Sequence, residues 1–409
     1  MKSFSKLLLT TLAFSFAVSC TVEEPHTGSY EVTSVKNLDG TLLEEAIFYL
    51  DGDSLGTFSI PHSIENLTIG SHTLNIRETA LNTTLINSTF SVEPDVKITK
   101  DFVVKLGTIA ISAINSETSE EIEDVNIYIN NELISLKPPT TLLLLEGNYS
   151  VKLQKDEFVH WEENFTLAAD EPINYAANLI PGFLTNALVE DFSNTSCIPC
   201  VEANIFLYEI LDEDETDRLY GIKYAVSWPQ VTDPFFQANT GDNASRYTYY
   251  QVLQAPTTYT NGNVSPNPLS KSDILNSIND KQSKVSPLGI TVTSALTGSD
   301  LKVDANLKLV KSTTTDDWRL FFVMIETYED FEEPPGSNGE TFFRDVMRDM
   351  QPDGTGLPIT FEIGVEQTHS YTFDTSNFDV DELECVVFVQ SQSTKEILQV
   401  ASTHRVNHN

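Results

Sequence analysis

The chain divides into three parts by the way apolar and polar residues are arranged along it. Up to about residue 180, apolar residues come in short runs rich in β-branched and aromatic side chains, bounded by Gly, Asn and Asp, with almost no helical periodicity. Such runs are typical of strands that bury one face. The first part is therefore predicted to consist of β-sandwich modules.

The runs in this first part repeat. Glu45–Gly52 ends in a polar turn, and Leu67–Ile76 contains a Gly turn that opens an alternating strand. The same two features return, in the same order, in Asp124–Asn131 and Leu144–Leu153. Strands joined through Gly and Asn turns are what a hairpin-built sandwich requires. The sequence therefore predicts two consecutive β modules.

This repeat resembles the PEGA-type β-sandwich module, in which a Gly turn likewise precedes an alternating strand. We assign residues 28–104 to the first module and residues 105–180 to the second. For both, the resemblance implies a spacer or an adhesive fold.

A different pattern begins at residue 183, where strand-like and helix-like segments alternate. Strands are predicted over 187–192, 220–228 and 257–260, and helices over 201–211, 243–252 and 270–284. This alternation predicts an α/β domain, which we assign to residues 183–285. Alternating strands then return and predict a C-terminal β-sandwich over residues 286–402. Its strands are expected at Leu288–Thr293, Leu301–Leu309, Trp318–Thr327, Ser370–Phe373, Glu384–Gln390 and Glu396–Ser402. The chain is thus predicted to be multidomain, β-rich plus α/β.

The N-terminus has the features of an export signal. Lys2 and Lys6 precede an apolar stretch, Leu7–Val18, that is too short to span a bilayer. The segment ends in Ala-Val-Ser-Cys, which resembles a bacterial lipobox. We therefore assign residues 1–20 to a lipoprotein signal peptide and expect Cys20 to carry a lipid anchor. This predicts an outer-membrane lipoprotein that faces the periplasm or the cell surface.

The formal net charge of the chain is −36. Such a balance repels nucleic acid and anionic membrane surfaces, both of which are bound through Lys and Arg. The sequence has no loop with the Asp-x-Asp-x-Asp-Gly spacing of a calcium site, and no Cys and His at zinc-site spacing. We therefore expect no nucleic-acid partner, no metal and no other cofactor.

The four cysteines have separate expected roles. Cys20 is assigned to the lipid anchor, and Cys385 lies in an apolar run and is expected to be a buried strand residue. Cys197 and Cys200 form a Cys-x-x-Cys at the start of a predicted helix. Two thiols at this spacing can close and reopen a disulfide, and the helix N-terminus favours the thiolate of the first one.

The segment around this motif resembles a thioredoxin fold. Pro199 precedes the second cysteine, and Asp191 lies six residues before Cys197, where thioredoxins carry a buried acid. Downstream, Ala255-Pro256-Thr257, followed by Asn261-Gly262, resembles the cis-proline strand and its turn.

The resemblance implies a role for each of these residues. Cys197 is the nucleophile, exposed at the start of the helix, and Cys200 resolves the mixed disulfide. Asp191 is the proton acceptor. Pro256 shapes the substrate groove, and Ala255 offers its backbone to an extended substrate chain. The partners would be thiols or disulfides of other proteins.

Taken together, several features resemble the outer membrane protein 28-related lipoproteins over residues 183–402. They are the lipoprotein signal and four segments: Val189–Cys200, Arg246–Tyr250, Phe343–Met350 and Leu383–Gln390. This family has no settled activity, so the resemblance bears on the fold more than on the function.

Three functions are compatible with these observations. The first is a thiol-disulfide oxidoreductase or thiol carrier outside the cytoplasm. The second is a non-catalytic binding or assembly lipoprotein in which the Cys-x-x-Cys is a structural disulfide, because an extracytoplasmic compartment keeps such a bond closed. The third is an adhesive or glycan-binding surface protein, in which the β modules carry the function.

Overall fold

The structure is a computed structural model, and it describes residues 26–79, 81–169 and 171–403. The expected signal peptide and Cys20 lie outside the described residues. No helix of this described part is both long and apolar enough to cross a membrane.

The chain forms two compact units. The first contains the described residues up to 110, together with 141–149 and 164–174. The second contains residues 111–140, 150–163 and everything described from 175 onward.

The first β module is built from two sheets. One has the strand order β4-β1-β7, with β1 (Thr27–Asn37), β4 (His62–Thr68) and β7 (Lys97–Val104). The other has the order β3-β2-β5-β6, with β2 (Glu45–Leu50), β3 (Asp53–Ser59), β5 (Gly70–Arg77) and β6 (Thr84–Val92). Every second residue of β5 is buried, and Leu74 and Ile76 pack there with Tyr30, Val32 and Phe48. The module therefore owes its core to the period-two alternation of its strands.

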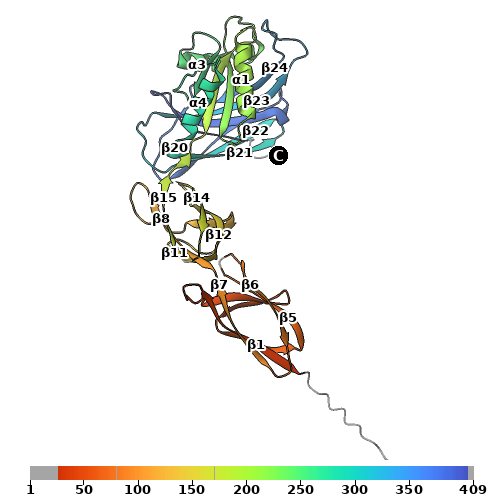
Figure 1. Ribbon diagram of the computed structural model, residues 1–409. Helices are drawn as coiled ribbons and strands as arrows, with labels where there is room; N and C mark the ends of the chain where they lie inside the picture. Colours follow the sequence, from red (N-terminus) through yellow and green to blue (C-terminus); the bar gives the residue numbers. More distant parts are fainter. Residues whose placement is uncertain (1–25, 80, 170, 404–409) are drawn as a thin grey trace, which may run out of the picture. The chain divides into compact units, whose positions relative to one another are not determined.

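The second β module repeats this strand order. Its four-stranded sheets are β10-β9-β12-β14 and β11-β8-β15-β13. Figure 1 labels β8, β11, β12, β14 and β15 of this module. The strands are β8 (Leu106–Asn115), β9 (Asn126–Ile129), β10 (Glu132–Leu133), β11 (Thr140–Leu145), β12 (Gly147–Gln154), β13 (Phe158–Val159), β14 (Trp161–Leu167) and β15 (Ile173–Pro181). The repeat seen in the sequence corresponds to the antiparallel pairs β2/β5 and β9/β12, which lie at the centre of equivalent sheets. Two β modules are thus confirmed.

The rest of the chain is organised around one mixed sheet with the order β19-β17-β18-β24-β23-β27-β28, in which β25 also pairs with β23. Strand β17 runs parallel to β18 and antiparallel to β19. The strands of this sheet are β17 (Ala187–Ser193), β18 (Leu219–Ala225), β19 (Thr257–Thr260), β23 (Trp318–Asp330), β24 (Phe342–Gln351), β25 (Leu357–Pro358), β27 (Leu383–Ser391) and β28 (Ile397–Ser402). The helices are α1 (Cys200–Asp212), α2 (Pro234–Ala238), α3 (Thr240–Tyr250), α4 (Lys271–Gln282) and the 3-10 helix η1 (Val380–Glu382).

Two smaller sheets accompany this mixed sheet. One pairs β16 (Phe183–Leu184) with β20 (Val285–Ser286). The other has the order β21-β22-β26, with β21 (Leu288–Thr297), β22 (Asp300–Leu309) and β26 (Glu366–Asp374). The predicted segments between residues 187 and 402 thus all form, with ends shifted by a few residues.

The division predicted between residues 183–285 and 286–402 does not separate two sheets. Strand β24 pairs in parallel with β18, where Val346 lies opposite Lys223, and pairs antiparallel with β23. The sequence did not predict β24 as a strand because pairs of charged residues interrupt its apolar pattern, at Arg344-Asp345 and Arg348-Asp349. Strands β23, β24, β27 and β28 therefore extend the α/β sheet, whereas β21, β22 and β26 form a separate sheet.

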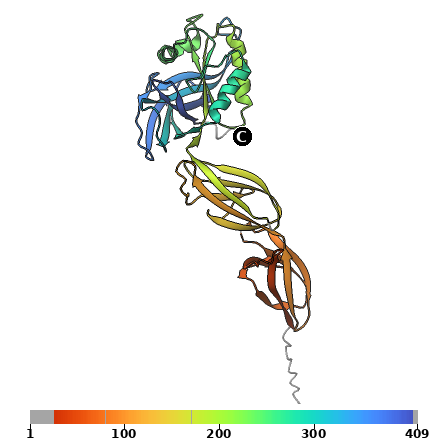
Figure 2. The same ribbon diagram turned by 60° about the vertical axis from the view of Figure 1, so that its left-hand side comes forward.

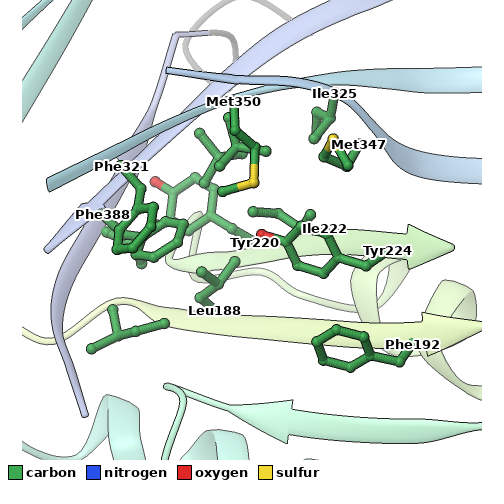
Figure 3. Packing of buried hydrophobic residues seen from close by; sticks show 14 of the residues in the cluster. Leu188, Phe192, Tyr220, Ile222, Tyr224, Phe321, Ile325, Met347, Met350 and Phe388 are labelled. Atoms are coloured by element: carbon green, nitrogen blue, oxygen red, sulfur yellow. The ribbon is translucent and has the colours of Figure 1, made fainter. Parts of the chain in front are cut away.

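Strand β23 has two buried faces with different partners. Phe321 packs with Leu188, Ile222 and Phe388 on the side of α3 (Figure 3). Val323 and Tyr250 belong to the same cluster. Phe322 and Met324 point the other way and pack against the sheet of β21, β22 and β26. A strand that buries both faces needs apolar residues at consecutive positions, as this one has.

Strand β17 is also buried on both faces along its whole length. Ala187 and Val189 pack with residues of α1 and α4, which lie side by side on one face of the sheet (Figure 2). Leu188 and Phe192 belong to the cluster on the opposite face, with α3. Glu190 and Asp191 are adjacent in β17, and because side chains alternate along a strand they point in opposite directions into the protein. Each of these buried carboxylates needs its own buried partner.

Candidate redox site

The two cysteines follow the carboxyl end of β17. Cys197 and Cys200 form a disulfide with a Cα–Cα distance of 5.4 Å. Helix α1 begins at Cys200, and the backbone N–H of that residue donates to the carbonyl of Cys197. The predicted order of strand, Cys-x-x-Cys and helix is therefore present.

The exposure expected for Cys197 is wrong. Its exposed fraction is 4%, and Cys200 is completely buried. Between them, the side chain of Ile198 is 74% exposed. Ile198 is thus the accessible part of the motif, and Cys197 is covered.

The cover is the loop between β23 and β24, residues 331–341, which we call the covering loop. The backbone N–H of Asn338 donates to the carbonyl of Thr195 at 3.1 Å, and its side-chain amide reaches the carbonyl of Cys197 at 3.4 Å. The N–H of Ser337 donates to Oγ of Ser196 at 3.2 Å. The covering loop is therefore held by direct hydrogen bonds to the three residues that end in Cys197.

A glycine allows this close approach. A Cβ atom on Gly336 would lie 2.1 Å from the carbonyl oxygen of Thr195, a distance at which backbone atoms must move apart. No left-handed backbone conformation is involved at this position, so the requirement for glycine is one of space alone.

Six residues before Cys197, Asp191 of β17 forms a buried ion pair with Lys223 of β18. The Nζ atom of Lys223 lies 2.6 Å from Oδ2 of Asp191, and the two side chains are 5% and 3% exposed. Lys223 also donates to Oδ1 of Asn204, at 2.5 Å. Burial lowers the pKa of Lys223, but the charge of Asp191 and the hydrogen bond to it outweigh burial, so the pKa lies above its ordinary value. Lys223 therefore stays protonated.

This ion pair is connected to the covering loop. Asn204 lies one turn after Cys200 on α1, and its side-chain amide donates to Oε1 of Glu340 at 2.7 Å. The other carboxylate oxygen of Glu340 accepts a hydrogen bond from Nδ2 of Asn338 at 2.5 Å. An unbroken path of hydrogen bonds thus runs from Asp191, through Lys223 and Asn204, to the loop that covers Cys197.

Four members of this path are not predicted by the sequence: Lys223, Asn204, Asn338 and Glu340. One of them left a signal, because Lys223 is a single cation in the otherwise apolar run from Leu219 to Val226. A charge in a strand that buries both faces needs a buried partner of opposite sign.

The proposed substrate-groove residues lie at the same end of the sheet as the disulfide. The Ala255–Pro256 peptide bond is cis. Strand β19 begins at the next residue, Thr257, which lies opposite Phe192 near the end of β17. Pro256 is buried and Ala255 is half-buried. The register therefore brings Pro256 beside the segment that leads to Cys197.

The remaining thiol takes no part in this site. Cys385 is completely buried in β27, and burial raises the pKa of its thiol well above the ordinary value. Within the described residues, no group of three or more His, Cys, Asp or Glu side chains is placed to hold a metal ion.

Comparison with known proteins gives one match to a family. Residues 114–182 match the PEGA domain. This confirms the PEGA-type resemblance for the second β module, whose boundaries were expected at residues 105 and 180. No curated protein matches the sequence.

Solved structures similar to this one include two proteins of Porphyromonas gingivalis. One is HBP35, with 11% identity and a TM-score of 0.46 over 54% of this chain and 75% of that chain. The other is a domain of the outer membrane lipoprotein Omp28, with 17% identity and a TM-score of 0.21 over 29% of this chain and 88% of that chain. A domain of an Omp28 lipoprotein is thus among the solved structures to which this chain is similar. At these identities and scores, no residue role is transferred from either protein.

Proposed function

We propose that this protein exchanges thiols and disulfides through Cys197 and Cys200, and that the covering loop controls access to the pair. The observation that carries the proposal is the buried ion pair of Asp191 and Lys223, which hydrogen bonds link through Asn204 to the covering loop. Burying two charges costs several kcal/mol, and apolar residues of similar size would stabilise a sheet at least as well. Buried ionisable residues with a specific charged partner occur more often at functional sites than in purely structural cores.

The exchange step itself is a two-electron transfer. In the reducing direction, the Cys197 thiolate attacks one sulfur of a partner disulfide, and the other partner sulfur leaves as a thiolate. The Cys200 thiolate then attacks Sγ of Cys197, so that the Cys197–Cys200 bond forms and the partner leaves as a dithiol. The oxidising direction is the same path reversed. In this account Asp191 takes the proton of Cys200, and the groove beside Pro256 and Ala255 holds the partner chain.

The expected partners are thiols or disulfides of other proteins outside the cytoplasm. The lipobox-like end of the N-terminal segment supports a lipid anchor on Cys20 and thus an outer-membrane location. The charge of −36 argues against a nucleic-acid partner.

A second candidate function is favoured by one observation, the 4% exposure of Cys197. A disulfide that stays covered is a structural clip, and the protein would then be a binding or assembly lipoprotein without redox activity.

Single-cysteine variants distinguish the two functions. In Cys200→Ser, the Cys197 thiol should form a mixed disulfide with oxidised glutathione, whereas in Cys197→Ser the fully buried Cys200 should not. The matched pair of variants loses the same disulfide, so a stability effect is common to both. Glutathionylation of neither variant, measured by mass under native conditions, would support the structural clip and contradict thiol exchange.

A further inference from the structure

A cavity lies on the α3 face of the mixed sheet, opposite the face that carries α1. Its volume is about 440 Å³, which lies within the range of small-molecule sites. The wall on one side is α3, and the wall on the other is formed by β23, β27 and the loop between β24 and β25. The residues that matter below are Arg246, Thr248, Tyr249, Arg319, Phe321 and Gln390.

The cavity lining has an unusual charge for this protein. The chain contains 60 acidic and 24 basic residues, yet the lining includes two arginines and no Asp or Glu. Its other polar groups are hydroxyls and side-chain amides, of which those of Tyr249, Thr355 and Gln390 already donate hydrogen bonds within the protein. The lining therefore offers two cationic side chains and no carboxylate, which suits an acceptor with negative charge.

Arg246 is the largest completely buried side chain of the described residues, and part of its bonding capacity is unused. Its Nη2 atom pairs with Oε1 of Glu190 on β17, and its Nη1 atom donates to Oε1 of Gln390 at 3.1 Å. Its Nε atom is buried and has no hydrogen-bond partner. A buried donor without a partner loses its hydrogen bonds to water and gains none in return, and native structures rarely leave one.

A hydrogen-bond network around Glu190 holds the side chain of Arg246 in place. The second carboxylate oxygen of Glu190 accepts from the hydroxyl of Tyr250, which in turn accepts from Nε2 of Gln390 at 2.7 Å. The guanidinium lies 4.9 Å from the ring centre of Phe321, within the range of a cation–π contact. The network fixes Arg246 from three sides, so its free Nε–H has a fixed direction.

The second arginine carries a charge that is not neutralised by direct contact. Arg319 is half-buried, and its Nη1 atom donates to the carbonyl of Gly356 at 3.1 Å. Among the described residues, no carboxylate lies within ion-pair distance of it. The nearby Asp353 instead accepts hydrogen bonds from the hydroxyl and the backbone N–H of Thr355. These hydrogen bonds hold the pKa of Asp353 below its ordinary value, and the charge of Arg319 contributes less.

We propose that this cavity binds a small organic anion, namely a carboxylate attached to an apolar or aromatic body. The carboxylate would accept from the Nε–H of Arg246 and pair with Arg319, and the rings of Tyr249 and Phe321 would contact the apolar body. The proposal does not rest on thiol exchange, because the cavity and the disulfide lie on opposite faces of β17. It also gives a role to Arg246 and Tyr249 of the Arg246–Tyr250 segment that the redox site leaves unexplained.

A matched pair of probes tests the charge requirement. Calorimetric titration of the full chain without its signal peptide should give a Kd at or below about 1 mM for 3-phenylpropanoate. The neutral 3-phenylpropanamide, which has the same shape, should bind at least tenfold more weakly. Equal affinity for the acid and the amide, or no binding of the acid at that concentration, would overturn the proposal.

Variants locate the site. Arg319→Gln should weaken the binding of 3-phenylpropanoate at least tenfold, and Ala244→Leu should abolish it by filling the cavity. Arg344→Gln is the control, because it removes the same charge from an arginine that pairs with Asp212 away from the cavity. If Arg344→Gln weakened binding as much as Arg319→Gln, the effect would be one of general charge and the assigned site would be wrong.

A spectroscopic readout follows Arg246 without changing it. The Nε–H resonance of this buried arginine should shift on addition of 3-phenylpropanoate and stay in place on addition of the amide. A resonance that does not respond to saturating 3-phenylpropanoate would show that the anion does not reach Arg246.

Discussion

Substitution of Lys223 by Met would leave the Asp191 carboxylate buried without a cation. The two side chains are 5% and 3% exposed and lie 2.6 Å apart, so water cannot replace the lost ammonium group without opening the sheet. Removing one partner of such a buried ion pair lowers the free energy of unfolding by about 3–5 kcal/mol. The methionine keeps the volume of the lysine stem, so most of this cost is electrostatic.

The loss can be measured in these two strands separately from the other domains. Amide hydrogen exchange in β17 and β18 gives the free energy of opening of these strands, and it should be measured at about pH 7.

A double variant provides the control. Asp191→Leu together with Lys223→Met removes both charges, and its opening free energy should return to within about 1 kcal/mol of the parent protein or exceed it. The reasoning would be refuted if Lys223→Met cost less than about 1 kcal/mol. It would also be refuted if the double variant lost as much as the two single variants added together.

Three further results are expected. Gly336→Ala should speed reduction of the disulfide by dithiothreitol several-fold, because the new Cβ would lie 2.1 Å from the carbonyl oxygen of Thr195 and push the covering loop away. The control Glu333→Ala, in the same loop, should leave the rate of reduction unchanged. Equal rates for the two variants would contradict the covering role. Cys385 should resist iodoacetamide until the protein is unfolded, since burial removes access and raises its pKa; labelling of the native protein would refute this. The pKa of His72, raised above 6.5 mainly by its hydrogen bond to Asp51, should fall in Asp51→Asn when followed by NMR. Protonated His72 thus stabilises the first module below about pH 6.5, and this contribution is lost as the pH rises through the raised pKa of His72. If the pKa of His72 were the same in Asp51→Asn as in the parent protein, the effect assigned to Asp51 would be refuted.

The parts of the redox site that the sequence predicted depend on local pattern. Strand β17, the Cys-x-x-Cys and helix α1 are consecutive in the chain, and an apolar run followed by a helical segment is visible without tertiary information. Strand β19 is likewise predicted from a short segment, Thr257–Thr260. Each of these features is specified by neighbouring residues.

The parts that the sequence did not predict depend on contacts between distant segments. The covering loop reaches Ser196 and Cys197 from 141 residues further along the chain, so no local pattern reveals that Cys197 is buried. The partner of Lys223 is set by strand register, which places it opposite Asp191 in the parallel pair β17 and β18. Strand β24 escaped prediction because its charged residues find partners in the folded sheet, as Arg348 does in Glu326.

The central claim is that the Cys197–Cys200 disulfide is exchangeable. The most direct test is a glutathione redox titration of the full chain without its signal peptide, with the two cysteines followed by alkylation and mass. The account predicts a midpoint between about −120 and −270 mV, the range of catalytic pairs. A pair that stays closed below about −300 mV would behave as a structural disulfide and would contradict the account.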